Sequence, residues 1–187
     1  MIELDLKISG LSVRLLRQAD EHALQRFLQE CEDFNWLVEG EPVQADAAEQ
    51  ALMDVPPGRK PEDKYLFGFF DERSRLAGVL DLLPDYPEEG TWWIGLLLFH
   101  PLQRGKGYGT QVVRELIKFA RSCGTRSLML GVVEENRKGF EFWQTHAFGL
   151  VRTTEPRAFG QKTQRVLVMK QDLTDQSDDK DLWRLLQ

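Results

Sequence analysis

Cysteine, long apolar runs and surplus positive charge are all scarce in this sequence of 187 residues. The two cysteines, Cys31 and Cys123, are too few for a disulfide framework, and because both lie in apolar helical patterns we expect buried, reduced thiols. No apolar run approaches the roughly 20 residues that a membrane-spanning helix requires, and the first residues lack the pattern of a signal peptide. These absences predict a cytoplasmic protein without a membrane anchor.

The charge balance excludes a further class of partner. Lys and Arg number 24 against 30 Asp and Glu, so the net charge is -6. Non-specific nucleic-acid binding relies on clustered basic residues; we therefore expect no nucleic-acid partner, whereas a cationic substrate is compatible with this charge. Apolar residues make up 42% of the chain, enough for the core of one domain. We assign that domain to residues 1–171 and an acidic tail to residues 172–187.

The apolar periodicity predicts strands that alternate with helices. Strands are expected at residues 11–17, 65–70, 76–83, 92–99, 127–133, 148–153 and 165–170, and helices after Asp20 and at residues 45–53, 107–122 and 136–145. The order β-α-α-β-β-β-α-β-α-β-β predicts an α/β fold, a mixed sheet with helices on both faces. Residues 92–133 form a βαβ crossover within it, and Gly95 predicts a bulge or a close backbone approach.

A glycine-rich loop connects the strand at residues 92–99 to the next helix. It consists of Arg104, Gly105, Lys106, Gly107, Tyr108, Gly109 and Thr110. Glycine permits positive φ and leaves the backbone accessible, and the amides at a helix start attract anions. Together with the charges of Arg104 and Lys106, this pattern predicts a pyrophosphate site.

Two familiar nucleotide motifs do not fit this loop. The dinucleotide fingerprint requires G-x-G-x-x-G and an acid about 20 residues further on, whereas the spacing here is G-x-G-x-G and no acid ends the next strand at that offset. A Walker loop before Gly105-Lys106 requires glycine where His100 stands and Ser or Thr where Gly107 stands. Both interpretations therefore fail on spacing.

The pattern that fits is Arg104-x-x-Gly107-x-Gly109 after Phe99-x-Pro101, together with a second stretch, Asn136-x-x-Gly139-x-x-Phe142-Trp143-x-x-x-x-Phe148. With both stretches, residues 11–170 resemble the GNAT acetyltransferase superfamily. The resemblance implies a GNAT-like fold with splayed central strands, acetyl-CoA as cosubstrate and no metal. It also allows a homodimer.

The resemblance further implies which residues hold acetyl-CoA. The loop from Arg104 to Thr110 would bind the pyrophosphate through its backbone amides. Leu97, Leu98 and Phe99 would pair with the pantetheine arm and orient the thioester carbonyl, and Asn136 and Trp143 would contact the cofactor from the other side. In many relatives a tyrosine stands at the position of Trp143 and protonates the leaving thiolate. An indole N–H cannot do so, which leaves Tyr108 and His146 as reserve acids, or a thiolate stabilised by dipoles.

A base must accept the proton of the attacking amine. Asp81 and Glu134 are our candidates, with Glu88 and Glu89 as further acids near the predicted cleft. Alternation places Asp81 on the face opposite Leu80 and Leu82. For Asp81 or Glu134 taken alone, a solvated surface charge is the more common interpretation of such a residue.

The acceptor site of this fold would involve residues 31–40 and 84–89, which mix aromatic and acidic side chains. They would hold a cationic amine, or else Phe34, Trp36 and Leu37 merely cap the core. Trp92 and Trp93 point to opposite faces, so at most one of them lines the cleft. We predict an N-acetyltransferase that transfers acetyl from acetyl-CoA to a primary amine of a small molecule or peptide by direct attack. The alternative is a non-catalytic, acyl-CoA-binding module with the GNAT fold.

Overall fold

The computed structural model describes residues 6–174. Its strands are β1 (Ser12–Leu15), β2 (Tyr65–Phe70), β3 (Leu76–Leu83), β4 (Thr91–Phe99), β5 (Ser127–Val133), β6 (Gly149–Thr153), β7 (Arg157–Phe159), β8 (Lys162–Gln164) and β9 (Val166–Asp172). Its α-helices are α1 (Glu21–Glu30), α2 (Glu32–Val38), α3 (Ala47–Met53), α4 (Tyr108–Ser122) and α5 (Arg137–Thr145), with short 3-10 turns at Gln18–Asp20, Pro61–Asp63 and Pro101–Gln103. No helix in this part of the chain has the length and apolar character that a bilayer span requires.

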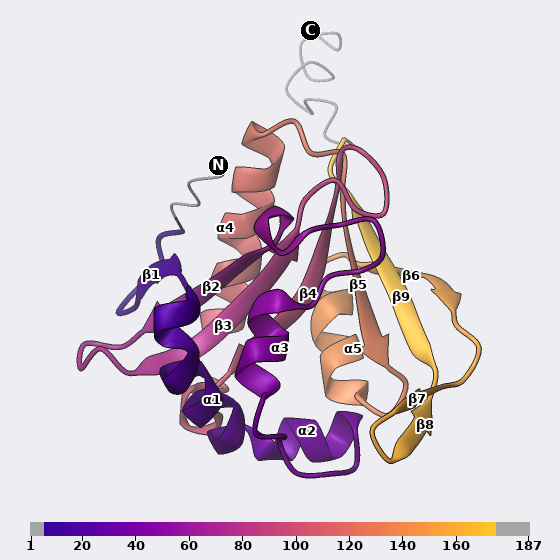
Figure 1. Ribbon diagram of the computed structural model, residues 1–187. Helices are drawn as coiled ribbons and strands as arrows, with labels where there is room; N and C mark the ends of the chain where they lie inside the picture. Colours follow the sequence, from indigo (N-terminus) through magenta and orange to yellow (C-terminus); the bar gives the residue numbers. More distant parts are fainter. Residues whose placement is uncertain (1–5, 175–187) are drawn as a thin grey trace, which may run out of the picture.

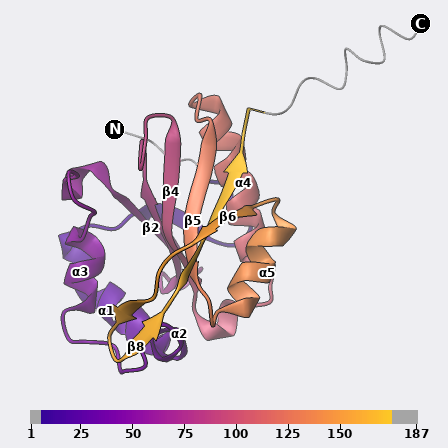
Figure 2. The ribbon, with the colours of Figure 1, turned by 90° about the vertical axis from the view of Figure 1, so that its right-hand side faces the viewer.

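One mixed sheet organises the molecule, in the strand order β1-β2-β3-β4-β5-β9-β6, and a separate hairpin pairs β7 with β8. The only parallel neighbours in the described sheet are β4 and β5, which α4 connects. Helices α1 and α3 cover one face and α4 and α5 the other, with the strands between them (Figure 1, Figure 2). The predicted α/β class and the βαβ crossover are thereby confirmed, although the predicted order lacks α2 and the β7-β8 hairpin.

The two faces of the sheet bury separate cores. On the α4 and α5 face, the strands contribute alternate residues such as Leu80, Leu82 and Leu130. On the other face, Leu66, Val79 and Leu98 pack against α1 and α3. This alternation follows from the two-residue period of a strand, and it assigns any polar residue within a strand to one face.

The pairing of β4 and β5 stops halfway along the strands. It runs from Thr91 opposite Ser127 to Ile94 opposite Leu130. On the other side of β4 the register shifts, because Leu82 lies opposite Ile94 whereas Asp81 lies opposite Leu96. Gly95 is the extra residue of this bulge, as predicted, and a bulge bends its strand away from a regular ladder. β4 and β5 therefore separate beyond Ile94, which confirms the predicted splay.

Several local expectations are corrected by the structure. Cys31 is buried as predicted, but Cys123 is exposed, since it follows the last turn of α4 where the chain leaves the core. Asp20 precedes α1, yet its carboxylate binds Arg14 and the Arg17 amide and does not cap α1. β9 extends to Asp172, two residues beyond the predicted end of the last strand, and Leu173 is buried. The rest of the predicted tail lies outside the described residues.

The chain makes an excursion between β6 and β9 that contains β7 and β8. The Thr154 amide donates to the Val166 carbonyl at 2.9 Å, and the Val166 amide donates to Thr154 Oγ1 at 3.0 Å. These two bonds close the excursion at its base. Its hairpin lies beside α2 (Figure 1), where the Gln161 amide donates to the Glu39 carbonyl at 2.8 Å.

Candidate active site

A cavity of about 300 Å³ occupies the gap between the separated ends of β4 and β5. Six elements line it: β4 and β5, Phe34 and Val38 of α2, Trp143 of α5, Arg157 and Phe159 of β7, and Val166 of β9. Trp93 lines it as well, whereas Trp92 belongs to the core on the α4 face, so one of the two tryptophans reaches the cleft, as predicted. Its volume is at the low end of the range for small-molecule sites.

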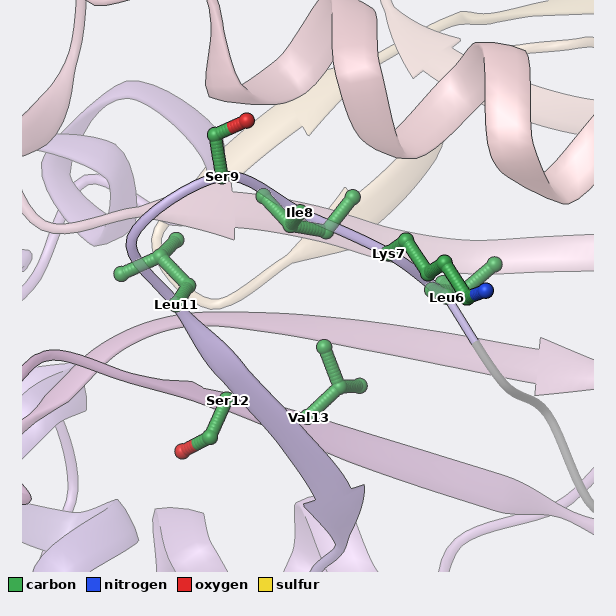
Figure 3. A pocket seen from close by; sticks show the side chains of 7 residues that line it. All are labelled: Leu6, Lys7, Ile8, Ser9, Leu11, Ser12 and Val13. Atoms are coloured by element: carbon green, nitrogen blue, oxygen red, sulfur yellow. The ribbon is translucent and has the colours of Figure 1, made fainter.

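A second hollow, of about 450 Å³, lies at the N-terminal segment (Figure 3). It is lined only by residues 6–13, and Lys7 is the one titratable side chain among them. Because a single segment forms it, it does not bring groups from different elements together. The cavity between β4 and β5 is therefore the candidate site.

The glycine loop follows the open end of β4 directly. Gly105 and Gly107 adopt φ of +77° and +83°, and no described atom lies within 4 Å of the position that a Cβ would take at either residue. The first hydrogen bond of α4 joins the Gln111 amide to the Gly107 carbonyl, so the amides just before Gln111 point out of the helix end. An open, positive-φ backbone at the positive end of a helix suits a pyrophosphate, and these residues therefore fit acetyl-CoA.

The two basic side chains of the loop have partners within the protein. Arg104 donates from Nε to the Phe99 carbonyl at 2.8 Å, and its guanidinium grips both carboxylate oxygens of Asp33 on α2. This pairing lowers the pKa of Asp33. Lys106 Nζ donates to Gln103 Oε1 at 2.8 Å. Arg104 thus ties the end of β4 to α2, and the exposed backbone amides of the loop are the groups that face outward.

The two sequence motifs meet in the structure. A Cβ on Gly109 would lie 3.2 Å from the Phe142 ring, so this glycine allows α4 to start against α5. Asn136 caps α5, because its Oδ1 accepts the Gly139 amide at 2.9 Å, and it also lines the cavity. Of the three β4 residues predicted to meet the pantetheine, Leu97 lines the cavity, whereas Leu98 and Phe99 are buried in the cores.

Asp81 lies behind the bulge of β4. It lies opposite Leu66, which belongs to the α1 and α3 face, and therefore faces away from Leu80 and Leu82, as predicted. A Cβ on Gly95 would lie 3.0 Å from Asp81 Cγ, so the missing side chain leaves the carboxylate next to the cavity wall. Lys64 Nζ lies 3.2 Å from Asp81 Oδ2, and its side chain is only 7% exposed.

The surroundings of Asp81 shift its pKa in opposite directions. Burial raises its pKa, and the charge of Lys64, with its hydrogen bond, counteracts this rise. A carboxylate with a raised pKa is a stronger base than an ordinary one. Lys64 itself is held by the Asp54 carbonyl, 2.9 Å from its Nζ. Lys64 was absent from the residues that the sequence suggested, because no pattern along the chain connects it to Asp81.

The other candidate acids and bases are exposed or are engaged elsewhere. Glu134 is exposed and, like Asp81, is not among the lining residues, although it directly follows Val133, which is. The Tyr108 ring stacks on Phe99 with centroids 5.8 Å apart, and His146 Nδ1 lies 2.8 Å from the Phe142 carbonyl. Trp143 is 8% exposed and lies against Phe148, yet it still forms part of the cavity wall.

Of the two segments that the sequence suggested for the acceptor site, only residues 31–40 contribute to the cavity wall. Phe34 and Val38 of residues 31–40 line the cavity, but the acids of both segments do not. Residues 84–89 precede the paired end of β4, where the Tyr86 ring packs edge-on against Trp93 at 6.0 Å. The sequence did not suggest Arg157 and Phe159, because only the docking of the hairpin brings them to the cavity.

Comparison with known proteins agrees with this geometry. The sequence profile of the acetyltransferase (GNAT) family matches residues 21–148, more than half of the chain. A search of curated proteins with this sequence found no match.

Solved structures share the fold at low identity. An acetyltransferase from Thermus thermophilus is 24% identical, with a TM-score of 0.70 over 88% of this chain and 98% of its own. A GCN5-related N-acetyltransferase from Kribbella flavida is 22% identical, with a TM-score of 0.63 over 87% and 98%. A spermidine N-acetyltransferase from Vibrio cholerae, in complex with CoA and spermine, is 16% identical, with a TM-score of 0.68 over 89% and 97%. With the splayed strands, the glycine loop and the profile match in agreement, the chain belongs to the GNAT family of acetyl-CoA-dependent N-acetyltransferases.

Proposed function

We propose that this enzyme acetylates the primary amine of a small molecule or peptide by direct attack, and that Asp81 is the base. The observation that carries the proposal is the position of the Asp81 carboxylate behind Gly95, next to the cavity between β4 and β5. Acetyl-CoA, when bound, supplies the activated acetyl group. The loop from Arg104 to Thr110 would hold its pyrophosphate, with Leu97, Asn136 and Trp143 along its arm.

The residues of this chain divide the remaining work. Asp81 takes a proton from the ammonium of the acceptor, directly or through one water, so that the resulting amine has the electron pair with which it attacks the thioester. Lys64 acts as a positioning residue that keeps Asp81 ionised. Trp143 offers its indole N–H as a hydrogen-bond donor. It can stabilise the negative charge of the leaving thiolate but does not transfer a proton to it. Glu134 is the second candidate base, since it follows β5 directly.

Thiol release from acetyl-CoA, followed across a panel of amines, tests the activity. The assay is best run in a Cys123→Ser background, because Cys123 is exposed and would itself react with a thiol reagent. We expect steady turnover with at least one class of amine. Tight acetyl-CoA binding without turnover on any amine would favour the non-catalytic, acyl-CoA-binding alternative.

A pair of variants separates the two candidate bases. Asp81→Asn is expected to lower kcat/KM by about 100-fold or more, with acetyl-CoA affinity retained, because general-base catalysis is worth roughly that factor. Glu134→Gln is the matched control and is expected to leave kcat/KM unchanged. The opposite result would transfer the role of base to Glu134.

A further inference from the structure

We infer that the acceptor carries a carboxylate besides its amine, as an amino acid does, and that Arg157 binds this carboxylate. The inference rests on the proposed function, since it concerns the acceptor side of the same cavity. Arg157 is the single charged side chain among the described residues that line this cavity. The rest of the wall is apolar or aromatic, apart from Asn136.

The hairpin that carries Arg157 is held firmly in place. Gln164 is 4% exposed, and its Nε2 donates to the last carbonyls of α2, those of Leu37 at 3.1 Å and Val38 at 2.6 Å. Lys162 Nζ donates to the same Leu37 carbonyl at 3.1 Å. These bonds cross-link β8 to the C-terminal end of α2, where free carbonyls need donors. The two walls of the acceptor side therefore form one unit.

The guanidinium of Arg157 is available to a ligand. It lies over the Phe159 ring, 4.7 Å from the ring centre, and this contact limits its freedom without using its N–H groups. None of the ion pairs found within residues 6–174 includes Arg157. The nearby Glu135 is paired with Lys162 at 2.7 Å. A planar guanidinium in this state matches a carboxylate through two parallel hydrogen bonds.

The charges of the site suit an amino acid better than a polyamine. Arg157 lines the cavity and Asp81 lies next to its wall with Lys64 as its partner, so Asp81 is the one acid and the two basic groups are Arg157 and Lys64. An amino acid presents the complementary pair, with its ammonium for Asp81 and its carboxylate for Arg157. A polyamine would bring additional positive charges to a wall whose one charged lining residue is cationic. The zwitterion is neutral overall, so the net charge of -6 does not repel it.

Matched acceptors test the inference. For several side chains, kcat/KM is measured with the amino acid, its amide and the amine that lacks the carboxyl group. We expect the acids to be preferred by about 10- to 100-fold, the range expected for hydrogen bonds to a charged group. Arg157→Gln should reduce this ratio to near one at an unchanged KM for acetyl-CoA, and Arg157→Lys should retain part of it. Arg152→Gln, which alters an exposed arginine of β6 outside the lining, is the control.

Calorimetric binding of the same amino acids in the presence of CoA distinguishes this inference from the proposed function. Binding that depends on Arg157 but gives no thiol release would retain the inference and overturn the function. Equal turnover of acids, amides and amines would retain the function and overturn the inference, as would an acid preference that survives in Arg157→Gln. Neither binding nor turnover with any of these acceptors would overturn the inference, and the wider panel of amines would then decide the function.

Discussion

At one end of the β4–β5 pair, Thr91 to Ile94 are in register with Ser127 to Leu130, while at the other end the same two strands enclose a cavity. The closed end is completed by a buried hydrogen bond of 2.9 Å between Thr91 Oγ1 and Ser127 Oγ. The open end begins at Gly95, the bulge residue. The residues at the closed end satisfy each other, whereas those at the open end leave polar groups available to ligands.

Helix α4 repeats this contrast along its length. Gly107 at its start and Gly124 after its end both adopt positive φ, +83° and +75°, and neither has a described atom within 4 Å of its Cβ position. Only Gly107 belongs to the open end. A single pair of strands and the helix between them thus combine a structural half with a binding half, and variants can be matched across the two.

The largest effect is expected from a charge in the glycine loop. Gly107→Glu places a carboxylate where we propose that the pyrophosphate binds and forces a side chain into positive φ, so acetyl-CoA affinity should fall by at least about 100-fold, or about 2.7 kcal/mol. Isothermal calorimetry measures this directly. Gly124→Glu imposes similar backbone strain at the closed end and should bind normally. Equal losses in both variants would show that strain, and not the loop, controls binding.

The next effect concerns the pH dependence of activity. Lys64→Met removes the charge that holds down the raised pKa of Asp81, so that pKa should rise further. Because the base must be ionised, the acid limb of kcat/KM should move to higher pH, with a loss of activity below the limb. Lys118→Met, at an exposed lysine of α4, should leave the profile in place. An unmoved limb in Lys64→Met would remove Asp81 from the role of base.

The raised pKa of Asp81 in the unaltered protein also affects its stability. Since the folded-state pKa of Asp81 is raised above 3.8, its contribution to the free energy of unfolding is fully present below that pH. It is lost as the pH rises through the folded-state pKa. Acid alone therefore does not unfold the protein through this residue.

A smaller effect is expected at the closed end. Thr91→Val leaves the buried Ser127 hydroxyl without its partner and should lower the free energy of unfolding by about 1–2 kcal/mol. The double variant with Ser127→Ala should recover part of the loss. Denaturant titration gives the energies, and kcat/KM should stay within about twofold. A large loss of activity would mean that the two ends are coupled.

The smallest effect concerns the thiols. Burial raises the pKa of Cys31 to about 11, whereas Cys123 is exposed. A thiol reagent at pH 8 should modify one cysteine per folded chain quickly and the second only after unfolding, with little effect on activity. Rapid modification of both residues would mean that the segment between α1 and α2 opens readily.

The features that sequence reasoning predicts well are those with local causes. A buried strand, a run of glycines and an amphipathic helix are each visible within a short window, so β4, the glycine loop and α4 could be predicted, together with the bulge at Gly95. α2 was not predicted because it is short, follows α1 without a glycine or proline between them, and contains residues of low helix propensity such as Asn35.

The acceptor side depends instead on distant contacts. Arg157 reaches the cavity only because Lys162 and Gln164 bind carbonyls of α2, about 125 residues earlier in the chain. The strands that carry these residues are only three residues long, and the residues of β8 are all polar, so neither strand has an apolar pattern that the sequence could reveal. The contact between Lys64 and Asp81 likewise depends on the pairing of β2 with β3, and no sequence spacing indicates it.

Two hydrogen bonds between Thr154 and Val166 hold the chain together where the hairpin leaves and re-enters the sheet. The stretch between them can therefore change in length or composition while β6 and β9 keep their register. It also begins after residue 148, where the match to the family profile ends. If Arg157 selects the acceptor, as we propose, substitutions within this hairpin should change which amine is used without changing the acetyl donor.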